Sequence, residues 1–456
     1  MKKRSNTLNN RLPLLSLVTF LPSVIFGYLP VVVLGSVSGV HVDLSLLYLL
    51  MAAVIALHLP FLKVSLPLLV QSPVWKILLG FTAYLWLSTI WSPNHIRAII
   101  TAGFMTSLLL LCSIIALRLP DLLKRTKLLA RLSAWAFILS GVFALWQLIA
   151  DALTISPTLT GLPTMYSGEV FGIARPTAFM LEPQFLGNLL ILPLLWSLWH
   201  ILEKTPRRTH YLILGSSVLL LSLTLSRGAL IASIIGCVLL TILARRPSLS
   251  VAGWTTFTIV VSIIVSLSTT FIFAEMRPDT ISGQKAVSKT ISQLTLGVID
   301  LSHPSASPVN TPSAPKEAIR SSGYIPSSTN SRLSMSSMAF NTWRTNPQTT
   351  LFGVGVGGFG TSLNPSQPGV IVNNYYLELL AETGIIGTLL FITFTALLLW
   401  HLTRQRQWLL LSLIVGLLVQ MNFFSGNANI VHIWVIIALA MGVTIHSKQK
   451  SMTDVF

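Results

Sequence analysis

Long apolar runs, separated by short polar connections, make up most of the chain between residues 12 and 446. Most of these runs have about 17 to 25 residues, the length that an α-helix needs to cross a bilayer. The runs are continuous rather than alternating, which is typical of membrane helices and not of a β-barrel. We therefore predict an all-α polytopic membrane protein with about twelve spans, at residues 12–36, 43–61, 74–92, 97–117, 129–152, 180–201, 209–226, 228–244, 250–273, 384–402, 407–424 and 428–446.

A long polar stretch interrupts this pattern at residues 274–350, which are rich in Ser, Thr and Pro. It predicts one large external loop between a first membrane part, residues 1–273, and a last part, residues 351–456, which holds a glycine-rich return segment and three spans. Long loops in compact proteins are often functional. Residues 331–346 have the apolar spacing of a short amphipathic helix at the membrane surface, and the composition of residues 302–328 indicates a flexible tether.

The charge distribution supports the membrane interpretation. Charged residues are only 9% of the chain, against about 25% in soluble proteins. The net charge of +17 would suit a nucleic-acid partner, but the basic residues gather in alternate connections between the spans. Placing both termini in the cytoplasm satisfies the positive-inside rule at each of these connections, so the charge indicates topology and no nucleic-acid partner. The basic residues before the first span then flank a membrane helix rather than a cleaved signal peptide.

Several arginines fall outside this rule, and two of them lie at places where a cation suggests chemistry. Arg227 occupies a very short turn between two predicted spans, and Arg332 begins the predicted amphipathic helix. A guanidinium group can bind phosphate oxygens through two parallel hydrogen bonds. The alternative is that Arg227 snorkels at a helix end and that Arg332 binds anionic lipid headgroups.

A third candidate group lies where the predicted external segment ends and the span at residues 180–201 begins. It contains Arg175, Glu182 and Pro183, and a proline here is typical of the first turn of a helix. Glu182 would be a carboxylate at a helix N-terminus near the membrane surface. It could act as a general base, or it could cap the helix and pair with Arg175.

Two further motifs follow the large loop. The glycine run at residues 352–360 fits a dinucleotide-binding pattern literally, but no alternating strand and helix pattern surrounds it. We interpret the run as a tightly turning backbone whose amides can approach an anion. Asn373 and Asn374 precede the next span and can cap it, or they can hydrogen-bond sugar hydroxyls while Tyr375 supplies an apolar face.

Taken in order, these motifs resemble the O-antigen ligase/polymerase family, bacterial membrane enzymes that act on lipid-linked glycans. The resemblance rests on three motifs between about residues 221 and 387, each weak when taken alone. They are Ser226-Arg227-Gly228; Arg332 with Trp343, Asn346, Pro347, Leu351 and the glycine run; and Asn373-Asn374 with Gly384 and Gly387. One departure concerns Asn373, because the ligase branch usually has a histidine there and asparagine cannot take up a proton at neutral pH. Either Glu182 or another external group then acts as the base, or the chain belongs to a polymerase-like branch.

The resemblance implies a GT-C-like fold and a metal-independent glycosyltransferase that needs no cofactor. The implied donor is an undecaprenyl-diphosphate-linked oligosaccharide, and the implied acceptor is another glycan or lipid A-core. The site would face the periplasm from the inner membrane, with Arg175, Arg227 and Arg332 at the diphosphate and Glu182 as the base. Asn373, Asn374 and Tyr375 would bind the glycan acceptor.

Two other classes of protein remain open at this stage. A flippase or transporter of lipid-linked oligosaccharides can also have about twelve spans, but it would favour repeat symmetry and charges at mid-membrane depth. A membrane scaffold would use the large loop to bind partner proteins, and its arginines would then be incidental.

Overall fold

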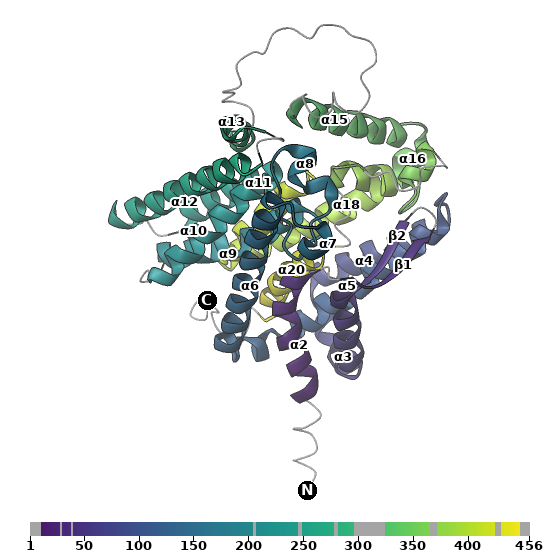
Figure 1. Ribbon diagram of the computed structural model, residues 1–456. Coiled ribbons are helices and arrows are strands. Elements are labelled where there is room, and N and C mark those ends of the chain that lie inside the picture. The colour runs from purple at the N-terminus through teal and green to yellow at the C-terminus, as the bar shows by residue number, and fades with distance from the viewer. Residues whose placement is uncertain are drawn as a thin grey trace. The chain divides into compact units, whose positions relative to one another are not determined.

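The computed structural model describes residues 11–27, 30–37, 40–203, 207–244, 249–277, 281–295, 324–364, 372–424 and 430–446. The chain forms two compact units (Figure 1). Unit 1 combines Met1–Phe137 with Ser334–Phe456, and unit 2 is Ile138–Leu333. Helices α6 (Thr126–Ala152) and α15 (Tyr324–Trp343) each contribute residues to both units. The predicted division at residues 273 and 350 stays a prediction.

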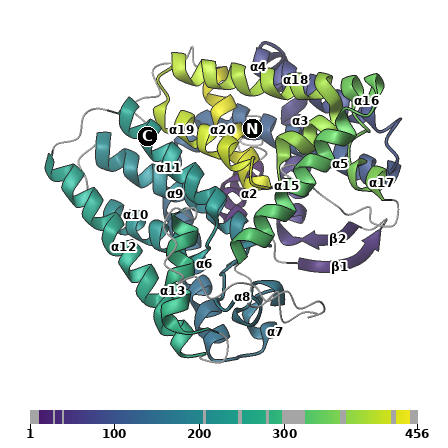
Figure 2. The ribbon, with the colours of Figure 1, turned by 90° about the horizontal axis from the view of Figure 1, so that it is seen from above.

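Unit 1 contains the elements from both ends of the chain. In its first half these are α2 (Arg11–Ser23), η1 (Val24–Phe26), β1 (Pro30–Val37), β2 (Val40–Ser45), α3 (Leu46–Val70), α4 (Pro73–Ser88) and α5 (His95–Leu123). In its second half they are α16 (Pro347–Phe352), α17 (Phe359–Leu363), α18 (Tyr375–Arg404), α19 (Trp408–Gln420) and α20 (Val431–His446). Helix α20 packs against α5, and α18 packs against α4 (Figure 2).

Unit 2 contains the middle of the chain. Beyond its share of α6, it holds α7 (Pro157–Thr160), η2 (Thr164–Tyr166), α8 (Gly168–Phe171), α9 (Pro183–Glu203), α10 (Arg208–Leu223), α11 (Arg227–Leu243), α12 (Leu249–Glu275) and α13 (Gly283–Leu294). Helix α9 packs against α10 and α11, and α10 packs against α12. Small residues allow this packing, since a Cβ on Gly187 of α9 would lie 2.8 Å from the Ala229 Cβ of α11.

The helical prediction is largely confirmed, because a helix overlaps each of the twelve predicted segments. Among the described residues, six helices are long and apolar enough to cross a membrane: α3, α5, α6, α9, α12 and α18. Shorter apolar helices lie in the segments Leu12–Phe26, Arg227–Leu243, Trp408–Gln420 and Val431–His446. The chain is therefore a polytopic, predominantly helical membrane protein.

The prediction of one continuous helix over residues 12–36 is wrong. Helix α2 ends at Ser23, and after η1 the chain forms an antiparallel hairpin in which Val32 pairs with Leu44 and Val37 with Val40. The local sequence explains the change, because Pro30 lacks an N–H and the valines that follow it favour extended backbone. The fold is thus not all-α within the described residues.

The predicted loop is more structured than its composition suggested. Helix α13 was not predicted, and α15 begins at Tyr324, inside the stretch expected to be a flexible tether. The helix predicted at residues 331–346 is present as the second half of α15, where Ala339 is buried and Leu333 and Phe340 are exposed. The rest of the expected tether, residues 302–323, lies outside the described residues.

Candidate active site

Arg175 is a buried arginine that joins two parts of unit 2. Its side chain is only 7% exposed, and its Nε donates a hydrogen bond of 3.0 Å to the carbonyl oxygen of Thr224. Its backbone N–H donates to the carbonyl oxygen of Tyr166 at 3.0 Å, and its guanidinium lies 5.8 Å from the Tyr166 ring centroid. Arg175 is thus fixed to the turn that leads into Arg227.

Arg227 is the first residue of α11 and is half-buried. The preceding turn is tight: Leu225 has a φ of 51°, and the backbone N–H of Ser226 donates to Thr224 Oγ1 at 3.3 Å. A helix N-terminus carries partial positive charge from its unpaired amides. The guanidinium and the helix end therefore add positive potential at the same place, which suits an anionic ligand.

Glu182 lies immediately before α9, and thus outside that candidate membrane span. Its carboxylate accepts a hydrogen bond from Gln184 Nε2. Burial raises the pKa of Glu182 above its usual range, while the Gln184 hydrogen bond and the charges of Arg175 and Arg332 oppose that shift. The carboxylate therefore interacts with both arginines, and the fold brings three of the predicted site residues together in unit 2.

Gln147 was not among the predicted site residues, although a glutamine inside an apolar run was a signal. Its fully buried amide Nε2 donates to Thr160 O at 3.1 Å and to Ala178 O at 3.3 Å. Its Oε1 accepts the backbone N–H groups of Thr177 and Ala178 at 3.0 and 2.8 Å. Ala178 has a φ of 49°, which alanine rarely adopts. Gln147 thus holds a strained backbone between Arg175 and Glu182.

Replacing Gln147 with leucine should destabilise unit 2. The change leaves the N–H groups of Thr177 and Ala178 buried without an acceptor, at about 1–3 kcal/mol each. We expect the free energy of unfolding to fall by about 3 kcal/mol, as measured by thermal or denaturant unfolding in detergent. Gln284→Leu, the same change at an exposed position of α13, is the control. Equal stability of the two variants would contradict the role given to Gln147.

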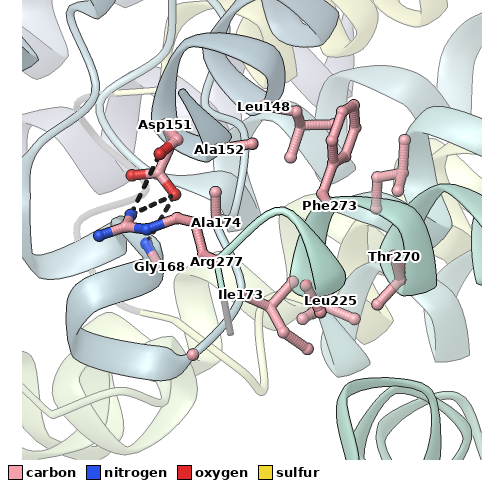
Figure 3. A pocket seen from close by; sticks show the side chains of 13 residues that line it. Leu148, Asp151, Ala152, Gly168, Ile173, Ala174, Leu225, Thr270, Phe273 and Arg277 are labelled. Carbon is pink, nitrogen blue, oxygen red and sulfur yellow. Dashed lines mark hydrogen bonds and ion pairs between the residues drawn. The ribbon is translucent and has the colours of Figure 1, made fainter. Parts of the chain in front are cut away.

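An ion pair between Asp151 and Arg277 lies close to this group, beside a small pocket of unit 2 (Figure 3). Arg277 Nη1 lies 3.3 Å from Asp151 Oδ2, and both side chains are largely buried. The same Oδ2 accepts the Gly168 N–H at 3.0 Å. The pocket is about 20 Å³, which is room for about one water molecule. Apolar side chains, among them Leu148 and Phe273, form much of its wall.

The predicted acceptor-binding residues belong to unit 1 and have visible structural roles. Asn374 Oδ1 accepts the Leu377 N–H at 3.2 Å, so the helix-capping interpretation is confirmed for Asn374. Tyr375 is buried, and its ring centroid lies 5.5 Å from that of Phe391. Asn373 is half-buried beside the cap. Sugar binding by these three residues stays a prediction.

The glycine run turns tightly, as predicted, and its amides do approach an anion. That anion is the chain's own Glu382 carboxylate, which accepts the N–H of Phe359 at 3.4 Å and also that of Gly357. Arg97 of α5 supplies the opposing charge. Tyr84 Oη donates a hydrogen bond to the carbonyl oxygen of Thr383 at 2.9 Å, which links this part of α18 to α4. The run therefore fastens α18 to α4 and α5.

No group of three or more His, Cys, Asp or Glu side chains that could hold a metal ion occurs in the part of the chain that the structure describes. The arrangement in unit 2 instead offers cationic donors and one carboxylate of raised pKa. Such a set can bind an anionic leaving group and accept a proton.

Residues 211–392 match the family model described as O-Antigen ligase, and this range contains all three motifs on which the resemblance rested. No curated protein matches the chain. With its apolar helices and this match, the chain is a membrane protein with an O-antigen ligase family domain at residues 211–392.

Proposed function

We propose that the protein transfers or polymerises an undecaprenyl-diphosphate-linked oligosaccharide onto a glycan acceptor at the outer face of the bacterial inner membrane. The family match supports ligase or polymerase activity. The observation that carries the proposal is the gathering of Arg175, Glu182 and Arg332 in unit 2, with Arg175 bound to the turn before Arg227. With both termini in the cytoplasm, the membrane helices would bring these residues to the outer face in a GT-C-like arrangement.

The arginines would act on the donor's leaving group. When the bond between the sugar's anomeric carbon and the phosphate oxygen breaks, that oxygen gains negative charge. Preorganised cations stabilise this charge most strongly in the transition state, where it develops. Arg227 at the start of α11, Arg332 on α15 and Arg175 would bind the diphosphate, and Arg175 would also orient the turn before Arg227. The proposal requires no metal ion.

Glu182 would take the proton from the attacking acceptor hydroxyl, because Asn373 cannot do so. The burial that raises the pKa of Glu182 makes its carboxylate a stronger base than an exposed glutamate. Asn373, Asn374 and Tyr375 would contact the acceptor glycan, which is either lipid A-core or a second lipid-linked glycan. The proton would then leave to solvent.

This role for Glu182 predicts a pH dependence. A base must be deprotonated, so kcat/KM should fall as the pH drops through the raised pKa of Glu182. Glu182→Gln should lower kcat/KM by about 10² to 10⁴-fold and abolish that acidic limb of the profile. Glu203→Gln, at the far end of α9, is the matched control. A Glu182→Gln enzyme that keeps both its rate and its acidic limb would exclude Glu182 as the base.

The activity itself can be tested with purified protein in detergent, given a lipid-linked oligosaccharide and a defined acceptor. Mass spectrometry should detect a new glycosidic product without any nucleotide sugar, and EDTA should leave its yield unchanged. Reconstituted vesicles that move the donor across the membrane without forming product would instead support the flippase alternative. Parallel assays with lipid A-core and with a second lipid-linked glycan would separate ligase from polymerase.

A further inference from the structure

We infer that the buried ion pair of Asp151 and Arg277 positions Arg175 for the reaction. The inference rests on the proposed function, in which Arg175 faces the donor diphosphate. Neither Asp151 nor Arg277 is assigned contact with the donor or the acceptor. Both would act through the backbone between residues 166 and 175.

The pair links three segments of the chain. Asp151 lies in the last turn of α6, and Arg277 follows the end of α12. Arg277 Nη1 reaches both Asp151 Oδ2 at 3.3 Å and the Asp151 carbonyl oxygen at 3.1 Å. Because Asp151 Oδ2 also accepts the Gly168 N–H at 3.0 Å, the pair holds the start of α8 against the ends of α6 and α12.

Only a short stretch of backbone separates this ion pair from Arg175. Helix α8 begins at Gly168, and the chain turns at Gly172, where a Cβ would lie 3.1 Å from Ile281. Ala174 is then buried in a cluster with Leu148 and Leu223. Arg175 follows, with its N–H bound to Tyr166 O. Moving Gly168 therefore moves the backbone that carries Arg175.

The surroundings make the pair difficult to replace. The Asp151 and Arg277 side chains are only 11% and 13% exposed, so a charge that lost its partner would stay largely out of water. Glu169 lies 3.7 Å from Arg277 Nη2, but its side chain is 71% exposed and screened by solvent. The small cavity beside the pair gives the backbone room to shift. Loss of the pair should therefore displace the backbone that carries Arg175, at some cost to the stability of unit 2.

A double-mutant cycle on product formation tests the inference. Arg277→Met should lower kcat/KM by about 100-fold, the effect that a displacement of about 1 Å can have on a reaction. Arg277→Lys, which keeps the charge, should recover part of the rate. If Arg277 acts through Arg175, then adding Arg277→Met to Arg175→Ala should lower the rate no further. Lys285→Met, at an exposed position of α13, is the control.

Three results are distinguishable. Effects of Arg277→Met and Arg175→Ala that multiply in the double variant would overturn the inference and leave the proposed function standing. An Arg175→Ala enzyme with an unchanged rate would overturn the role of Arg175 in the proposed function. If Arg277→Met does not fold, Asp151→Ala replaces it in the cycle, because it removes the acceptor that holds the Gly168 N–H. The same non-additive result is then expected, and multiplying effects would again overturn the inference.

Discussion

Replacing Arg227 with alanine is expected to lower kcat by about 10² to 10³-fold, the usual effect of removing one preorganised group that stabilises transition-state charge. The physical reason is its position at the start of α11, where the guanidinium and the N-terminus of the helix both supply positive potential. The diphosphate is more negative in the transition state than in the bound donor. The loss should therefore appear in kcat more than in KM.

Arg404→Ala is the matched control, because Arg404 is also an arginine at a helix end and lies over the Trp400 ring at 5.5 Å. We place Arg404 on the cytoplasmic side, so its loss should leave turnover unchanged. Arg227→Lys should be intermediate, since an ammonium keeps the charge but cannot form a bidentate contact with phosphate. If Arg227→Ala and Arg404→Ala enzymes turned over at the same rate, Arg227 would be only a snorkelling arginine.

Changing Gly384 to alanine should destabilise unit 1 by about 4 kcal/mol, combining backbone strain with steric overlap. Gly384 interrupts α18 with a φ of 63° and a ψ of −164°, a conformation nearly restricted to glycine. An added Cβ would lie 2.4 Å from the carbonyl oxygen of Leu351 and 2.6 Å from the Gly353 nitrogen. Thermal unfolding in detergent, together with the yield of folded protein, measures the effect.

Gly80→Ala is the control for this substitution. Gly80 lies within helix α4, and a Cβ there would meet no atom within 4 Å. Alanine favours helix over glycine by about 1 kcal/mol, so this variant should be as stable as the parent or slightly more stable. Equal unfolding temperatures for Gly384→Ala and Gly80→Ala would show that α18 tolerates a regular helix at Gly384.

The sequence by itself predicted most helices, the polytopic class and the family. These properties depend on local information, since the length of an apolar run is set by the thickness of a bilayer. The same rule produced the error at residues 12–36. Total hydrophobicity cannot separate a membrane helix from an apolar hairpin, and the arrangement of Pro30 and its neighbouring valines decided the outcome.

Tertiary structure alone decided how the candidate residues are grouped. Arg332 is far in sequence from Arg175 and Glu182, and its electrostatic interaction with Glu182 depends on how unit 2 folds. The roles of Gln147 and of the Asp151–Arg277 pair could not be predicted, because a buried polar group is defined by the partners that packing brings to it. Motif spacing thus predicted the candidate residues, and long-range packing determined which of them lie near one another.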